Sequence, residues 1–170
     1  MDLDIHIRDI PDFPKPGIIF KDITPLLCHA QAFDASVRAL ADPFLDKDID
    51  AVVGIESRGF IFGAPVSRDL KAGFVPIRKP GKLPADTLSV SYALEYGEDT
   101  IEIHRDALSV GQKVLLIDDL LATGGTMAAA CELVGKTGAT IVGLAFLAEL
   151  SFLGGREKLN EHAIHSVLTY

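Results

Sequence analysis

The segment Lys113-Val114-Leu115-Leu116-Ile117-Asp118-Asp119-Leu120-Leu121-Ala122-Thr123-Gly124-Gly125-Thr126 decides the fold class of this chain. Its apolar run over residues 113–117 is typical of a buried parallel strand. A helix is expected from about residue 126 to 136, directly after two glycines and two threonines. A buried strand, a short polar turn and a helix together favour an α/β fold.

The same alternation of strands and helices continues on both sides of this segment. Pro43 predicts a kink or an early end of the helix expected over residues 33–45. Pro76 places the strand expected over residues 74–77 near a sheet edge. We therefore expect a doubly wound, mostly parallel sheet flanked by helices, with ligands at the carboxyl ends of the strands. The expected strands are residues 51–55, 74–77, 140–147 and 164–168, and the expected helices are residues 33–45 and 59–71.

Two segments fall outside this alternation. The first 27 residues hold four prolines, which predicts a tight, irregular arm rather than a helix, and we assign residues 1–30 to that arm. Residues 79–103 form a long excursion with a basic, turn-forming start and a loosely alternating ribbon, so it is a candidate for a flexible lid loop. With 170 residues and no internal repeat, the chain is expected to form a single domain, residues 1–170.

Composition limits the function classes. The chain carries 16 basic and 24 acidic residues, a formal net charge of −8, which disfavours nucleic acid and anionic membrane surfaces as partners. Apolar stretches are too short to span a membrane. Cys28 and Cys131 match no metal or redox spacing, and no leader-like segment is recognised, so free thiols and a cytoplasmic location are expected.

Residues 118–126 combine two kinds of chemistry. The start of a helix presents unpaired backbone N–H groups and a positive dipole end, so residues 122–126 are suited to hold a phosphate. Two neighbouring carboxylates would repel that phosphate, so Asp118 and Asp119 need hydroxyl groups or a hydrated metal as partners. A phosphorylated ribose supplies both features. The alternative is that the acids only cap the helix and the glycines only form a turn.

An apolar strand followed by Asp-Asp, two apolar residues and Ala-Thr-Gly-Gly-Thr resembles the phosphoribosyl diphosphate signature of the type I phosphoribosyltransferases. Among them the chain is most similar to the members that use adenine, almost from end to end. The blocks that carry the resemblance are residues 12–23, 56–60, 78–84, 91–97 and 118–133.

This resemblance implies an enzyme that transfers 5-phosphoribose from 5-phosphoribosyl 1-diphosphate to adenine and forms AMP and diphosphate, a purine-salvage reaction. It implies Mg²⁺ bound by the substrate, no metal held directly by the protein, and a homodimer. Two alternatives stay open. One is a related enzyme for hypoxanthine, guanine or xanthine, and the other is a regulator that senses the diphosphate substrate and binds nucleic acid or a partner.

The resemblance also implies roles for individual residues. Asp118 and Asp119 would hold the ribose diol, Glu95 would handle the base proton, and a strained or cis peptide is expected at Glu56–Ser57. Phe20 is expected to stack on the base, with core packing as the alternative. The remaining expected site residues are Ala122, Thr123, Gly124, Gly125 and Thr126 for the phosphoribose; Glu56, Ser57, Arg58, Arg78, Lys79 and Lys82 for the diphosphate; Ile19, Phe20, Lys21, Arg58 and Leu120 for adenine; Arg58 also in catalysis; and Tyr96 in the lid.

Overall fold

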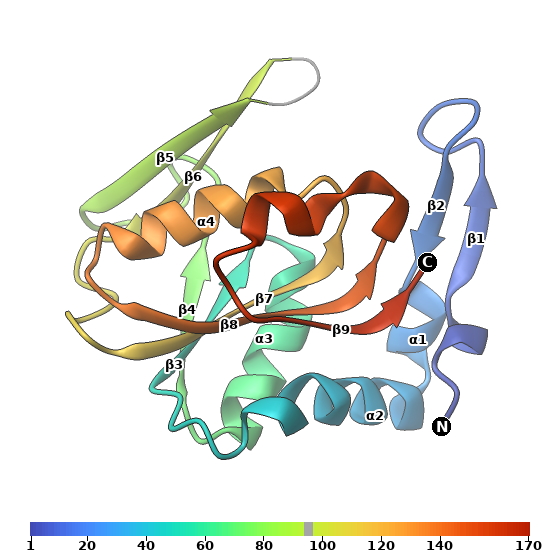
Figure 1. The fold of residues 1–170 in the computed structure, drawn as a ribbon, viewed down its shortest axis with the longest axis horizontal. Coiled ribbons are helices and arrows are strands. Elements are labelled where there is room, and N and C mark those ends of the chain that lie inside the picture. Colours follow the sequence, from blue (N-terminus) through green and yellow to red (C-terminus); the bar gives the residue numbers. More distant parts are fainter. Residues whose placement is uncertain (94–96) are drawn as a thin grey trace.

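The computed structural model describes residues 1–93 and 97–170. Its central sheet has five strands in the order β4-β3-β7-β8-β9 (Figure 1), and every neighbouring pair in it is parallel, as predicted. The edge position of β4, which contains Pro76, is also confirmed. The strands are β3 Ala51–Ile55, β4 Gly73–Ile77, β7 Lys113–Leu121, β8 Thr140–Glu149 and β9 Ile164–Thr169.

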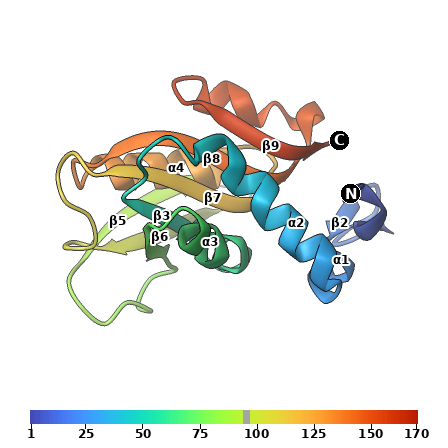
Figure 2. The ribbon, with the colours of Figure 1, turned by 90° about the horizontal axis from the view of Figure 1, so that it is seen from below.

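Helices cover both faces of this sheet, with α2 and α3 on one face and α4 on the other (Figure 2). The predicted early end of the helix before Pro43 is confirmed, because α2 ends at Ala41 and a 3₁₀ turn follows. The helices are α1 Thr24–Cys28, α2 Ala30–Ala41, α3 Arg58–Asp69 and α4 Gly125–Gly135, with 3₁₀ helices η1 Asp4–His6, η2 Asp42–Phe44, η3 Ser151–Leu153 and η4 Gly155–Leu159.

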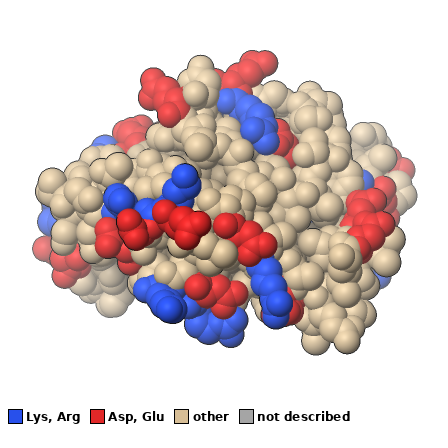
Figure 3. All heavy atoms as spheres, turned by 60° about the horizontal axis from the view of Figure 1, so that its bottom comes forward, with Lys and Arg blue, Asp and Glu red and all other residues tan. Residues whose placement is uncertain are grey.

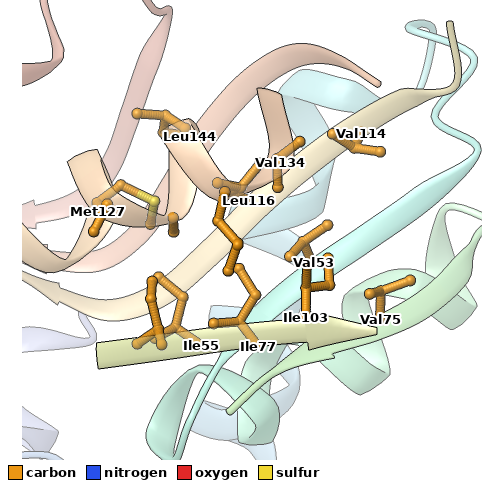
Figure 4. Packing of buried hydrophobic residues seen from close by; sticks show 14 of the residues in the cluster. Val53, Ile55, Val75, Ile77, Ile103, Val114, Leu116, Met127, Val134 and Leu144 are labelled. Carbon is orange, nitrogen blue, oxygen red and sulfur yellow. The ribbon is translucent and has the colours of Figure 1, made fainter. Parts of the chain in front are cut away.

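Alternate residues of the central strands build two cores. On β7, Leu115 and Ile117 pack toward α2 and α3, whereas Val114 and Leu116 pack toward α4. Figure 4 shows the second cluster, in which Leu116 lies among side chains from α4 and the neighbouring strands. Burying one such side chain contributes about 1.5–3 kcal/mol, so the two cores hold the strands firmly between the helix layers.

The strand order reverses between β3 and β7. After β3 the chain continues through α3 to β4 on one side, and after β7 it continues through α4 to β8 on the other side. The segments that follow β3 and β7 therefore diverge at this point, where open α/β sheets bind their ligands. Glu56 to Arg58 follow β3, and Ala122 to Gly125 follow β7.

The N-terminal arm is more regular than predicted. It contains an antiparallel hairpin of β1 Arg8–Pro11 and β2 Ile19–Asp22, followed by the helix α1. The expectation of an irregular arm without a helix was wrong, because Pro25 lies in the first turn of α1, where its missing N–H needs no partner.

The excursion is also largely regular. Strands β5 Thr87–Ala93 and β6 Glu98–His104 form an antiparallel ribbon. In Figure 1 this ribbon and the β1–β2 hairpin lie at opposite ends of the sheet. Leu94, Glu95 and Tyr96 lie outside the described residues, and this includes the two expected lid residues, Glu95 and Tyr96.

The surface charge and the helix lengths are relevant to nucleic acid and membranes as possible partners. On the face in Figure 3, acidic and basic side chains are interspersed. Within residues 1–93 and 97–170, no helix has the length and apolar character needed to cross a membrane.

Candidate active site

The two adjacent carboxylates lie inside a strand rather than after it. Strand β7 continues past Asp118 and Asp119 to Leu121, because its pairing with β8 extends to Leu121 opposite Glu149. Asp119 is buried, with 5% of its surface exposed. Asp118 lines a cavity at the carboxyl end of the sheet. The predicted pair is therefore present, on a rigid strand.

The electrostatics of this pair favour partners that donate hydrogen bonds. Burial raises the pKa of both carboxyl groups, and the neighbouring charge of Asp119 raises that of Asp118 further. Arg58 opposes the shift at Asp119, since its Nε lies 3.0 Å from Asp119 Oδ2. Asp118 Oδ1 accepts a hydrogen bond of 2.9 Å from the backbone N–H of Asp119.

The cavity beside Asp118 lies at the start of α4. It measures about 90 Å³ and is lined by Asp118, Met127, Phe146 and every residue from 120 to 126. Gly124 is the residue before the helix, and its φ of 79° is a left-handed conformation that favours glycine. The unpaired backbone N–H groups of a helix start attract an anion. The structure thus brings together all five residues expected to bind phosphoribose, together with Leu120, which was expected at the base.

A second glycine, Gly155, packs against the loop of residues 122–126. A Cβ atom at Gly124 would lie only 2.5 Å from the carbonyl oxygen of Gly155, and a Cβ at Gly155 would overlap the carbonyl oxygen of Ala122. Backbone therefore packs on backbone here. Gly155 was not predicted as a site residue, although the Gly154-Gly155 pair a few residues after a buried strand is a signal that could have indicated it.

Arg58 connects the N-terminal arm to the carboxylates. Its guanidinium carbon lies 5.5 Å from the centre of the Phe20 ring, while its Nε contacts Asp119. Phe20 is half-buried and meets Phe13 edge-on, with ring centres 5.2 Å apart. The Phe20 ring lies in neither core cluster. An aromatic ring with this exposure beside a guanidinium offers a surface on which a flat base can stack.

The neighbours of Phe20 on β2 differ in what their side chains do. Ile19 is 56% exposed. Lys21 Nζ lies 2.7 Å from Asp9 Oδ1 and 3.7 Å from the centre of the Tyr170 ring, so its side chain is occupied on the arm. Because Ile19 and Lys21 are two residues apart on one strand, their backbone groups point to the same strand edge.

Glu56 binds the basic segment that follows β4, residues 78–82. Its carboxylate accepts hydrogen bonds from Lys82 Nζ at 2.6 Å, from the Lys79 N–H at 2.9 Å and from Arg78 at 3.4 Å. Burial alone would raise the pKa of Glu56, but these donors outweigh it and lower the pKa to about 2. The predicted cis peptide between Glu56 and Ser57 is confirmed.

The β5–β6 ribbon contacts both the basic segment and the loop of residues 122–126 at the start of α4, which we call the phosphate loop. Asp99 forms an ion pair with Lys79 and accepts a hydrogen bond of 3.2 Å from the Tyr92 hydroxyl. The same hydroxyl lies 3.2 Å from Thr126 Oγ1. No role was predicted for Tyr92 or Asp99, because their partners are remote in the sequence: Thr126 is 34 positions from Tyr92, and Lys79 is 20 positions from Asp99.

Within the described part of the chain, no group of three or more His, Cys, Asp or Glu side chains could hold a metal ion. Phosphate oxygens, hydroxyl groups and water are the ligands that Mg²⁺ prefers. The carboxylates of Asp118 and Asp119 are oxygen donors of the kind that suits a hydrated Mg²⁺ ion.

Comparison with known proteins identifies relatives along the whole chain. Residues 26–166 match the family model of the phosphoribosyl transferase domain. The adenine phosphoribosyltransferase of Rhodopirellula baltica is 58% identical over 170 residues, which are 100% of this chain and 82% of that protein.

Solved structures agree with this match. The crystal structure of adenine phosphoribosyltransferase from Thermoanaerobacter pseudethanolicus has a TM-score of 0.96 and 51% identity, covering 99% of this chain and 98% of that one. The Saccharomyces cerevisiae enzyme, crystallised with an imino-altritol bisphosphate and adenine, has a TM-score of 0.93 and 40% identity over 98% of this chain and 96% of its own.

Proposed function

The chain belongs to the phosphoribosyltransferase family, and within it to the adenine phosphoribosyltransferases, and from that premise we propose how its residues divide the reaction among them. The enzyme transfers 5-phosphoribose from 5-phospho-α-D-ribose 1-diphosphate to adenine and forms AMP and diphosphate. In this reaction the bond from ribose C1 to the diphosphate oxygen breaks, a bond from C1 to adenine N9 forms, and the N9 proton leaves.

The observation that carries the assignment of roles is the cavity at the start of α4, with Asp118 on its wall. We assign the 5-phosphate to the backbone of Ala122 to Thr126 and the two ribose hydroxyls to Asp118 and Asp119. Burial raises the pKa of both carboxyl groups, so their charged forms gain from hydrogen-bond donors, which the two ribose hydroxyls supply. The same pair faces the ribosyl centre, where positive charge develops.

We assign diphosphate binding to the segment that follows β3 and to the basic segment. Glu56 holds the side chains of Arg78 and Lys82 and the backbone of Lys79, and the Lys79 ammonium pairs with Asp99. The diphosphate is therefore offered a preformed group of cations and the backbone of Ser57 and Arg58. The carboxylate of Glu56 orients these cations and does not itself contact the diphosphate. When Mg²⁺ is bound to the substrate, it neutralises charge on the leaving diphosphate.

Adenine is placed between the arm and Arg58. Phe20 stacks on the base, the backbone of Ile19 and Lys21 reads its edge, and Arg58 joins the base to Asp119. The yeast relative was crystallised with adenine, which supports this class of ligand. Glu95 is our candidate for the N9 proton, and Tyr96 for closing the lid.

We also propose a homodimer in the cytoplasm. Large apolar side chains outside the core, such as Phe152 with 75% of its surface exposed, offer area for a second copy. Both cysteines are free thiols, which suits a reducing compartment. Light scattering after gel filtration tests the dimer.

The decisive experiment measures diphosphate release from 5-phosphoribosyl 1-diphosphate and Mg²⁺ with adenine, hypoxanthine, guanine, xanthine or no base. Release with adenine alone, together with AMP, is the expected result. Release with another base would keep the reaction and overturn the adenine pocket. No release with any base would contradict the transferase function.

A further inference from the structure

One buried charged group at this end of the sheet has no role in the reaction described above. Glu149 is the last residue of β8 and is 4% exposed. Its two carboxylate oxygens accept hydrogen bonds of 2.7 Å each from Nε and Nη2 of Arg156. Ser166 Oγ on β9 donates a third bond of 2.8 Å. A fully bonded, two-pronged ion pair of this kind fixes both partners in one geometry.

What this ion pair fixes is the segment behind the phosphate loop. Arg156 directly follows Gly155, at the start of η4. Gly155 is the residue whose backbone packs against Ala122 and Gly124 without room for a Cβ atom. A continuous path of direct contacts therefore runs from Glu149 through Arg156 and Gly155 to the loop at the start of α4.

We propose that Glu149 and Arg156 are positioning residues for the 5-phosphate subsite. Their ion pair holds Gly155 against the backbone of Ala122 and Gly124, and this contact sets the direction of the N–H groups that receive the phosphate. Neither residue touches the substrate. The inference rests on the proposed function, because it takes residues 122–126 as the phosphate-binding loop.

A purely structural role predicts a different result. Glu149 and Arg156 also join β8, β9 and η4, so their loss lowers the thermal midpoint in either case. A structural anchor alone leaves phosphate affinity unchanged in the protein that remains folded. Positioning weakens phosphate affinity selectively, and the two roles are separated by binding measured below the thermal midpoint.

The first test compares Arg156→Gln with Arg38→Gln, which removes the exposed Arg38–Asp34 pair of 2.9 Å on α2. The readouts are the Kd for ribose 5-phosphate by calorimetry and the KM values for both substrates. We expect Arg156→Gln to raise the Kd for ribose 5-phosphate and the KM for the diphosphate substrate about tenfold, because small displacements of positioning groups are costly. The KM of Arg156→Gln for adenine stays within about twofold, as do all three constants of Arg38→Gln. Arg156→Lys, which keeps the charge, recovers part of the loss.

Two further variants protect the test against misfolding. The double variant Glu149→Gln/Arg156→Gln leaves no unpaired buried carboxylate. Gly155→Ala keeps the ion pair but pushes on Ala122, and Gly135→Ala is its control, because a Cβ there meets nothing within 4 Å. Both Gly155→Ala and the double variant are expected to weaken ribose 5-phosphate binding as Arg156→Gln does.

The outcomes separate the inference from the proposed function. If the wild-type protein makes AMP and binds ribose 5-phosphate, but the folded variants bind it equally well, the positioning role is overturned and the function stands. If the wild-type protein neither makes AMP nor binds ribose 5-phosphate, the proposed function and the positioning role fall together.

Discussion

Replacing Gly124 by alanine tests the geometry of the phosphate loop most directly. Gly124 has a φ of 79°, which costs alanine about 1–2 kcal/mol. In addition, the new Cβ would lie 2.5 Å from the Gly155 carbonyl oxygen, and relieving such an overlap costs about 1–3 kcal/mol. The free energy of unfolding is therefore expected to fall by about 2–5 kcal/mol.

Gly111 provides the matched control for this variant. Its φ of 80° is almost the same, but a Cβ there would meet nothing within 4 Å. Gly111→Ala therefore incurs only the backbone cost of about 1–2 kcal/mol. The difference between the two variants isolates the contact of Gly124 with Gly155.

Urea unfolding and steady-state kinetics check both variants. Since the overlap must move the loop or Gly155, Gly124→Ala is expected to raise the KM for 5-phosphoribosyl 1-diphosphate at least about tenfold, with Gly111→Ala unchanged. Equal losses of stability and equal KM values in the two variants would refute the close packing of the loop on Gly155.

Three further predictions concern the carboxylates and the base. Asp118→Asn with Asp119→Asn is expected to lower kcat/KM at least about a hundredfold. Folding raises the pKa of both acids, so their charged forms lower the stability of the folded protein at neutral pH, and the urea midpoint of the double variant should not fall below that of the wild type. An unchanged kcat/KM would remove the pair from the mechanism. Phe20→Leu should raise the KM for adenine about two- to tenfold, the value of an aromatic stack, and a KM that rises only for the diphosphate substrate contradicts base stacking. Folding lowers the pKa of Glu56 from 4.5 to about 2, so its stabilisation is complete above pH 4.5 and is lost as the pH falls toward 2. The stability difference between wild type and Glu56→Gln should shrink over that window in urea titrations, and a constant difference would show that Glu56 carries no such shift.

The parallel sheet could be predicted because its strands are short apolar runs separated by helical patterns. Residues 51–55 and 113–117 have this form, and both are buried strands in the structure. The strand end was harder to place, because Asp118 and Asp119 resemble a polar turn. Pairing with β8 continues beyond them, and this pairing depends on a neighbour that the local sequence does not specify.

The site was predictable where neighbouring residues carry the chemistry. Residues 122–126 are contiguous, so their composition predicts an anion-binding helix start, and the cavity lies there. Contacts between distant segments left no local signal. Tyr92 reaches Thr126 from another element, and Glu149 on β8 accepts a hydrogen bond from Ser166 on β9, 17 positions along the chain. In the arm, Pro25 was misinterpreted, because proline is common both in loops and in the first turn of a helix and its presence alone does not distinguish the two.

The distribution of charge explains how an acidic chain accommodates an anionic substrate. The net charge is −8, yet the phosphate loop from Ala122 to Thr126 contains no charged side chain and offers only backbone and hydroxyl groups. The cations of the basic segment are already held by two carboxylates, Glu56 and Asp99. Because each cation has a partner within the protein, the basic segment keeps its shape before the substrate arrives. An incoming diphosphate then meets side chains that are already ordered, which lowers the entropic cost of binding.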